Sequence, residues 1–180
     1  SADNTVHVVE QYKITYPRHH IRCIRLTVNR GPAAARNAGM REARGSILFF
    51  TDDDCVVPAL WIESHVNVYA RNPEVVSVGG WYTPLSRELR ESSYALFIHL
   101  WYKFLFRDAN IEREGKNILF KRSVFPAVNT GNLSLKKYIV NTIGGFDERF
   151  KAPGSEDTEF CQRIRRNGFG MYFLPLMVTH

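Results

Sequence analysis

The sequence predicts an α/β domain in which a mostly parallel sheet is flanked by helices. Segments with helical and strand-like hydrophobic patterns alternate along the first 81 residues, as is typical of such sheets. Three consecutive aspartates, residues 52–54, close one strand-like segment, at the carboxyl end where open α/β sheets bind ligands. With 180 residues, of which 44% are hydrophobic, the chain is long enough for a single domain, residues 1–180, with its own core.

Local signals define the elements in chain order. Pro17 ends a first helical pattern, in which the apolar residues have a mixed spacing. Pro32 suits the first turn of an alanine-rich helix, which Gly45 ends. The expected elements are a helix at residues 4–16, a strand at 21–28, a helix at 32–43, a buried strand at 46–51, a helix at 58–70 and a strand at 75–81.

Charge and cysteine content limit the partners and the compartment. The net charge of +6 comes from basic residues that are scattered along the chain, so we expect no nucleic-acid partner. The cysteines, Cys23, Cys55 and Cys161, are odd in number and widely separated, which argues against a disulfide framework and a structural zinc site. A reducing compartment, the cytoplasm, is the simpler expectation.

Residues 94–106 are apolar on nearly every side and are flanked by Arg87, Arg90 and Arg107. A helix over residues 89–106 is too short to cross a bilayer. One interpretation is a helix that lies on a membrane surface, with its arginines on lipid phosphates. The other is a helix buried in the core or in an interface between copies of the chain.

The aspartates after residue 51 are candidates for a metal site. Strand alternation places Asp52 and Asp54 on one side and Asp53 on the other. Mg²⁺ and Mn²⁺ are commonly held by one or two carboxylates together with substrate phosphates, so this pair suggests a metal shared with a phosphorylated substrate. The alternative is an acidic loop, or a helix N-terminus before Pro58.

A second acidic group begins a helix that extends to about residue 168. Ser155 is a candidate N-cap, and Glu156, Asp157 and Glu159 occupy the first turn. Acids in a first turn are stabilised by the helix dipole, so helix capping alone also explains them. Their chemical meaning depends on the neighbouring motifs.

Taken together, the motifs resemble those of the family-2 glycosyltransferases. They occur in the family's order at residues 33–39, 47–54, 129–134, 144–150 and 156–157. The resemblance covers most of the chain and implies a glycosyltransferase-A fold, a nucleotide-sugar donor, a divalent metal and inversion at the anomeric carbon by direct displacement.

The resemblance also implies roles for single residues. Asp157 is expected to be the general base, and Glu156 to orient the acceptor or Asp157. Asp54 is expected to bind Mg²⁺ or Mn²⁺, with His180 near the metal. The residues implied in donor binding are Asp52, Asp53, Gly31, Arg36, Asn37, Gly131 and Asn132. The plainer interpretations are a surface cation for Arg36, a helix cap for Asn37, a turn with positive φ for residues 144–145 and no role for His180.

The chain departs from the family pattern at both ends. Residues 1–5 resemble the tail of an early acidic segment of the family, so we expect an N-terminally truncated domain without the first βα unit and without the C-terminal part. Such a domain exposes a sheet edge, which favours a homo-oligomer or weak donor binding.

The expected function is transfer of a sugar from a UDP-, GDP- or dTDP-sugar to a hydroxyl of a polysaccharide or lipid-linked glycan, as in cell-envelope biosynthesis. The nucleotide is assigned to residues 1–81 and the acceptor to residues 82–180, at the cytoplasmic face of a membrane. A catalytically silent fragment or binding module is the alternative. A sugar-nucleotide pyrophosphorylase ranks lower because the chain has no glycine-rich, lysine-bearing triphosphate loop.

Overall fold

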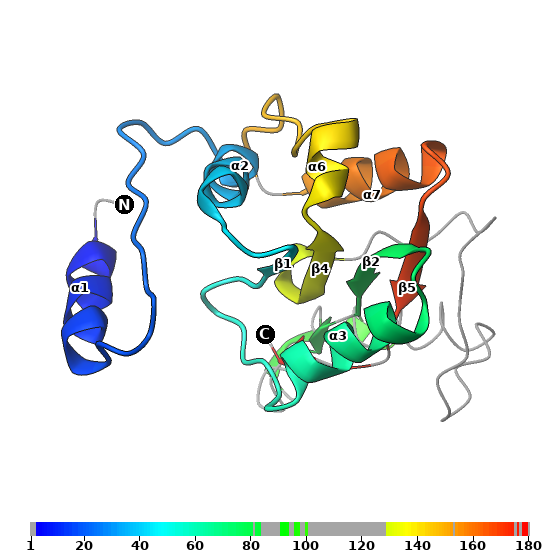
Figure 1. Cartoon of the computed structure of the whole chain (residues 1–180). Coiled ribbons are helices and arrows are strands. Elements are labelled where there is room, and N and C mark those ends of the chain that lie inside the picture. The colour runs from blue at the N-terminus through cyan, green and yellow to red at the C-terminus, as the bar shows by residue number, and fades with distance from the viewer. Residues whose placement is uncertain are drawn as a thin grey trace.

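The chain folds around a mixed sheet with helices on both faces (Figure 1). The structure is a computed structural model. It describes residues 3–80, 82–83, 91–93, 96–97, 100, 129–152, 154–174, 176 and 178–179.

The four-stranded sheet has the order β1-β4-β2-β5. Its strands are β1 (Ile47–Phe50), β4 (Leu133–Lys136), β2 (Val75–Gly79) and β5 (Gly170–Phe173). Strand β4 pairs antiparallel with both β1 and β2, and β2 pairs parallel with β5. Three of the strands therefore point the same way, which agrees with the predicted mostly parallel sheet, and the reversed strand β4 separates two of them.

One face of the sheet is covered by α2 (Pro32–Glu42), α6 (Tyr138–Ile143) and α7 (Glu156–Arg166), and the other by α3 (Trp61–Arg71) (Figure 1). The larger core cluster joins α2, α6 and α7 to the sheet through residues such as Leu135, Ile139 and Phe160, which are all 0% exposed. A smaller cluster joins α3 to β2 and β5. Because β-strand side chains alternate between faces, β2 and β5 contribute to both clusters, through Val76 and Met171 on one side and Val75, Val78 and Tyr172 on the other.

The predicted helices and strands of residues 32–79 are confirmed, with small shifts at their ends. Pro32 lies in the first turn of α2, as expected, but Ala43 already has extended backbone, so the helix ends before Gly45. Helix α3 begins at Trp61 rather than at residue 58. Short-range signals of this kind rarely define helix ends to the residue.

A second, two-stranded sheet pairs β3 (Tyr82–Thr83) with β6 (Val178–Thr179). The backbone of Val56 exchanges two hydrogen bonds with that of Thr179, at N···O distances of 2.7 and 3.0 Å. The end of the described chain is thereby fixed beside the loop that follows the aspartates at residues 52–54.

The N-terminal segment, residues 3–30, stands apart from the sheet (Figure 1). Helix α1 (Thr5–Thr15) confirms the predicted helix and has no buried residue. The predicted strand at residues 21–28 is wrong: this stretch has no strand structure. A strand needs a partner for its N–H and C=O groups, and none of the described strands pairs with it.

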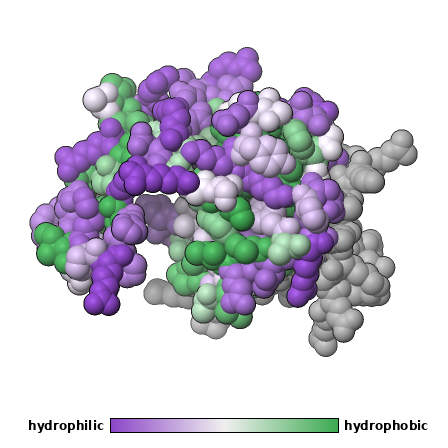
Figure 2. Space-filling model, in the orientation of Figure 1, coloured by the Kyte–Doolittle hydropathy of each residue, from purple (hydrophilic) through white to green (hydrophobic). Residues whose placement is uncertain are grey.

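Apolar side chains are exposed around the start of α3 (Figure 2). They are Val56, Val57, Leu60, Ile62 and Val66. Most of the predicted helix at residues 89–106 lies outside the described residues, and so does His180. Within the part of the chain that the structure describes, no helix is both long and apolar enough to cross a membrane.

Candidate active site

Arg36 brings the two acidic motifs together. Its side chain extends from α2, and its two terminal nitrogens donate to Glu156 Oε1 at 2.6 Å and to Asp52 Oδ1 at 3.2 Å. Asp52 follows β1 and Glu156 begins α7, so residues that are far apart in the sequence meet beside one helix. We call Arg36, Asp52, Glu156 and Asp157 the acid cluster.

The aspartates after β1 lie on a turn in which the Cys55 N–H donates to the Asp52 carbonyl at 3.2 Å. Asp52 is partly exposed through its pairing with Arg36, whereas Asp53 and Asp54 are exposed to solvent. A ligand from solvent can therefore reach the side chains of Asp53 and Asp54.

Glu156 is buried, with a side chain that is only 4% exposed. Its Oε1 accepts from Arg36, and its Oε2 accepts from the backbone N–H of Gly154 at 2.8 Å. A buried carboxylate without such partners is strongly unfavourable. One oxygen of Glu156 therefore links α7 to α2, and the other stabilises the turn that precedes α7.

Ser155 occupies the predicted N-cap position of α7, but the predicted capping by its side chain is wrong. The side chain makes no capping hydrogen bond, and the residue has a left-handed backbone with φ of 75°. It is the one non-glycine residue with positive φ among the residues that the structure describes. Such a conformation is unfavourable for serine and persists only where its surroundings hold it.

The pKa of Asp157 is raised above its ordinary value. Burial is the largest cause, and the negative charge of Glu156 adds to it, whereas the Thr158 N–H and the Arg36 guanidinium act in the opposite direction. A carboxylate with a raised pKa is a better proton acceptor than an ordinary aspartate. Asp157 thus has the electrostatic environment that a general base needs.

Asn37 joins the motif on α2 to the motif at residues 144–150. Its side-chain amide accepts from the Phe146 N–H at 2.8 Å and donates to the Phe146 carbonyl at 2.9 Å, and it also donates to Glu148 at 3.0 Å. A Cβ atom at Gly145 would lie 2.4 Å from Asn37 Oδ1. The Asn37 side chain therefore stabilises contacts within the protein, and its part in donor binding stays a prediction.

A side chain would not fit at Gly31 and would be tightly packed at Gly131. Gly31 has φ of +88°, and a Cβ there would lie 2.3 Å from the Lys151 carbonyl oxygen. A Cβ at Gly131 would lie 3.3 Å from both Asp52 Oδ2 and Cys55 Sγ. Gly131 thus lies against Asp52 of the acid cluster, and its part in donor binding stays a prediction.

Asn132 is fully buried. Its amide accepts from Trp61 Nε1 at 2.8 Å and donates to the Leu176 carbonyl at 2.7 Å. The next turns of α3 continue this buried polar contact, because His65 Nδ1 and the Tyr69 hydroxyl both lie within 2.9 Å of Ser134 Oγ. The side chain of Asn132 therefore fixes the turn that bears Gly131.

The carboxylates of Asp52 and Asp54 fit a hard divalent cation that a phosphorylated ligand helps to hold. Among the described residues, no group of three or more His, Cys, Asp or Glu side chains is placed to hold a metal ion alone. Mg²⁺ and Mn²⁺ rarely need such a cage. The donor set therefore fits a shared metal site rather than a structural one.

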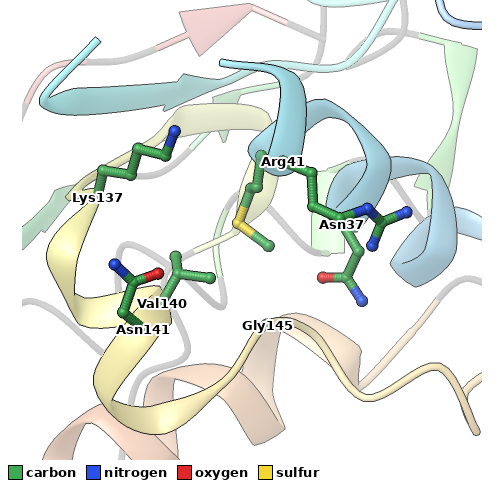
Figure 3. Close-up of a pocket in the computed structure, with 7 residues that line it drawn as sticks. Asn37, Arg41, Lys137, Val140, Asn141 and Gly145 are labelled. Atoms are coloured by element: carbon green, nitrogen blue, oxygen red, sulfur yellow. The ribbon is translucent and has the colours of Figure 1, made fainter. Parts of the chain in front are cut away.

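A pocket of about 480 Å³ lies between α2 and α6 (Figure 3). It is lined by Asn37, Met40, Arg41, Lys137, Val140, Asn141 and Gly145. None of the acids of the acid cluster lines it, so this pocket is separate from the candidate active site.

Several residues of the site were not identified from the sequence. The Phe146 ring lies under the Arg36 guanidinium at 5.8 Å, and no local pattern marks that contact. Trp61, His65 and Tyr69 were missed too, although their spacing of four residues places them on one helical face.

Two models of known protein families match the chain. The model for glycosyl transferase family 2 matches residues 1–129, which is more than half of the chain. The chain belongs to this family. A second model, described as the N-terminal domain of galactosyltransferase, matches residues 119–180.

One relative of this family member is the inactive polypeptide N-acetylgalactosaminyltransferase-like protein 5 of Macaca fascicularis, which is 25% identical over 174 residues. The match covers 91% of this chain and 38% of the macaque protein. The chain therefore spans well under half of the length of this relative.

Solved structures of glycosyltransferases have the same fold. A mannosyltransferase from Pyrobaculum calidifontis in complex with GDP-Man and Mn2+ matches with a TM-score of 0.71 and 21% identity, over 99% of this chain and 44% of that one. GalNAc-T7 with UDP, GalNAc and Mn2+ matches with a TM-score of 0.69 and 15% identity, over 98% of this chain and 35% of that one. At these identities the likeness establishes the glycosyltransferase-A fold.

Proposed function

We propose that this chain contains the donor-binding and base-bearing parts of an inverting glycosyltransferase. The enzyme transfers a sugar from a nucleoside diphosphate sugar to a hydroxyl of a glycan or lipid-linked acceptor. The main support is the pair of ion pairs through which Arg36 joins Asp52 to Glu156. A donor held at Asp52 and a base at Asp157 then lie in one site.

In the proposed reaction, the acceptor oxygen attacks the anomeric carbon and the bond from that carbon to the diphosphate oxygen breaks. Asp157 takes the proton of the acceptor hydroxyl as the oxygen attacks, which its raised pKa favours. Glu156 holds the turn from which Asp157 extends. Attack opposite to the leaving diphosphate inverts the configuration at the anomeric carbon.

On the donor side, Asp52 and Asp53 are proposed to contact the nucleotide, and Gly131 to allow close approach of the sugar. Asp54 would hold Mg²⁺ or Mn²⁺ with His180, and the bound ion would supply positive charge to the departing diphosphate. The backbone pairing of Thr179 with Val56 holds the described end of the chain beside the loop that follows the aspartates. A UDP- or GDP-sugar is the leading donor class, given the ligands of the two structural neighbours.

The acceptor side of the proposal includes peripheral contact with the cytoplasmic face of a membrane. Leu96, Phe97 and Leu100, within the apolar stretch that the sequence marks, are 43%, 57% and 53% exposed. Exposed apolar side chains of this kind suit a lipid surface or a lipid-linked acceptor. They also suit a homo-oligomer, which is the alternative for this stretch.

A catalytically silent binding module is the second candidate. The macaque relative, which is matched over 91% of this chain, has the word inactive in its name. A silent module would keep the fold and the nucleotide site but transfer no sugar. Binding and turnover must therefore be measured separately.

Calorimetry with a panel of nucleoside diphosphates and their sugars, with and without Mn²⁺, tests the donor site. We expect metal-dependent binding of one nucleotide. Absence of binding by the whole panel, both to this chain and to an upstream-extended version, contradicts the proposal.

Asp157→Asn separates the two candidates. For an enzyme, this change lowers turnover by about 10² to 10⁴-fold and leaves donor binding intact. Glu74→Gln is the matched control, because Glu74 is exposed between α3 and β2, outside every motif of the family, and the change should leave turnover unchanged. Donor binding without any turnover in the wild-type chain identifies the silent module.

A further inference from the structure

We propose that Arg36 is a positioning residue, which links the donor-side acid Asp52 to the turn that bears Asp157. This turn, residues 154–157, is called the acid turn below. The inference rests on the proposed function, because it specifies how two parts of the same site act together. It assigns to Arg36 a role beyond contact with the donor.

The geometry of the Arg36 fork supports this role. Its two terminal nitrogens bind two different acids, Glu156 at 2.6 Å and Asp52 at 3.2 Å. A guanidinium presents several donors in one rigid plane, whereas a lysine is a single point charge. Only an arginine side chain therefore reaches both acids with fixed relative positions.

Burial gives these ion pairs their importance. The side chain of Arg36 is 17% exposed and that of Glu156 is 4% exposed. Removal of one partner from such a pair leaves an uncompensated charge away from water, which is strongly destabilising. The carboxylate of Glu156 would then have to leave its position.

Arg36 is itself held in place. Its guanidinium lies over the Phe146 ring at 5.8 Å, within the range of a cation–π contact. The neighbouring Asn37 binds the backbone of the same phenylalanine through two hydrogen bonds. The arginine is thus oriented before any ligand binds.

Glu156 connects Arg36 to the acid turn. Its second oxygen accepts from the Gly154 N–H at 2.8 Å. Gly154 has φ of 113°, which glycine adopts readily, but Ser155 beside it has φ of 75° and needs support from its surroundings. If Arg36 no longer holds Glu156, this turn relaxes and Asp157 loses its place.

Asp52 completes the link. It is proposed to contact the donor, and it shares Arg36 with Glu156. Occupation of the donor site then acts on the same guanidinium that supports the acid turn. The donor side and the acid turn therefore share one support, the Arg36 guanidinium.

Hydrogen exchange of the Gly154 amide tests the structural half of the inference on this chain without any substrate. In Arg36→Gln the exchange should be faster by about tenfold or more, the loss expected when a hydrogen bond to a charged group is no longer supported. Arg36→Lys should fall between the two, and Arg41→Gln, at an exposed arginine of the same helix, should match the wild type. Unchanged exchange in a folded Arg36→Gln overturns the inference; if that variant does not fold, Arg36→Lys decides by the same criterion.

Turnover tests the functional half. With saturating donor and acceptor, Arg36→Gln should lower kcat by about 100-fold, and the further change Glu156→Gln should lower it no more, since both act through one turn. An increased KM for the donor with unchanged kcat overturns the inference, because it identifies a simple donor contact. If the wild-type chain transfers no sugar, the proposed enzymatic function fails, while the exchange experiment still decides the role of Arg36.

Discussion

Helices α1, α3 and α7 have the same length, 11 residues each, but different surroundings. Helix α1 buries no residue. Helices α3 and α7 each bury four, including the polar side chains of His65 and Glu156. The N-terminal segment, residues 3–30, therefore depends on local interactions, whereas the sheet region, residues 31–80 and 129–179, depends on contacts between distant parts of the chain.

The polar contacts differ in the same way. In helix α1 of the N-terminal segment they are short-range, as in Lys13 with Glu10. The segment also forms ion pairs with Glu42 and Glu148, through Arg22 and Arg30 side chains that are 45% and 61% exposed. In the sheet region, Arg36 and Asn37 bind partners more than 100 residues away. Exposed short-range pairs contribute little to stability, and buried pairs are costly to break. The candidate active site is therefore built in the region where each change has a large effect.

The largest expected effect comes from Gly31→Ala, at the junction of the two regions. The new Cβ would overlap the Lys151 carbonyl, and alanine would have to adopt φ of +88°. Together these should lower the free energy of unfolding by about 4 kcal/mol, measured by urea denaturation. The control is Gly39→Ala, where a Cβ meets nothing within 4 Å and a gain of about 0.5 to 1 kcal/mol is expected in a helix. Equal effects at the two glycines would contradict this prediction.

Asn132→Ala should have the next largest effect. It leaves Trp61 Nε1 and the Leu176 carbonyl without their present partner, and two such losses should cost about 3 kcal/mol of stability. Asn67→Ala, at an exposed position of α3, should change stability by less than about 0.5 kcal/mol. A loss below about 1 kcal/mol for Asn132→Ala would mean that the buried polar contacts do not hold the turn.

The pH dependence of the free energy of unfolding tests the burial of His65. Burial lowers its pKa from 6.5 to about 4, so below pH 6.5 the unfolded chain binds a proton that the folded chain does not. The stabilisation is complete above pH 6.5 and is lost as the pH falls toward 4, by up to about 3 kcal/mol. Urea denaturation across this range should show the loss in the wild type but not in His65→Gln. The same slope in both proteins would assign the pH dependence to other groups.

The smallest effect is expected in the N-terminal segment. Ile14 is 72% exposed, whereas Ile139 is 0% exposed. Ile14→Ala should change stability by less than about 0.5 kcal/mol, and its control Ile139→Ala should cost about 2 to 3 kcal/mol. A large effect of Ile14→Ala would show that the N-terminal segment is covered in solution, and would remove the contrast between the two regions.

Prediction from the sequence succeeded where short-range signals suffice. Pro32 predicted the start of α2, and hydrophobic patterns predicted β1 and β2. The alternation at residues 21–28 is a strand signal as well, but pattern alone supplies no partner strand. Strand β4 was not predicted, because its hydrogen bonds go to β1 and β2, far from it in the chain.

The sequence by itself determined which residue types this protein has for its chemistry: the aspartates after β1, the acids that begin α7 and the glycines between them. Their order along the chain was enough to recognise the family. Only the tertiary structure decided how these groups meet, because the distance from Arg36 to Glu156, the burial of Asp157 and the clearance at Gly145 depend on the packing of α2 against distant segments. Spacing in the sequence determines contacts within one helix or strand, and the packing of the elements determines all the others.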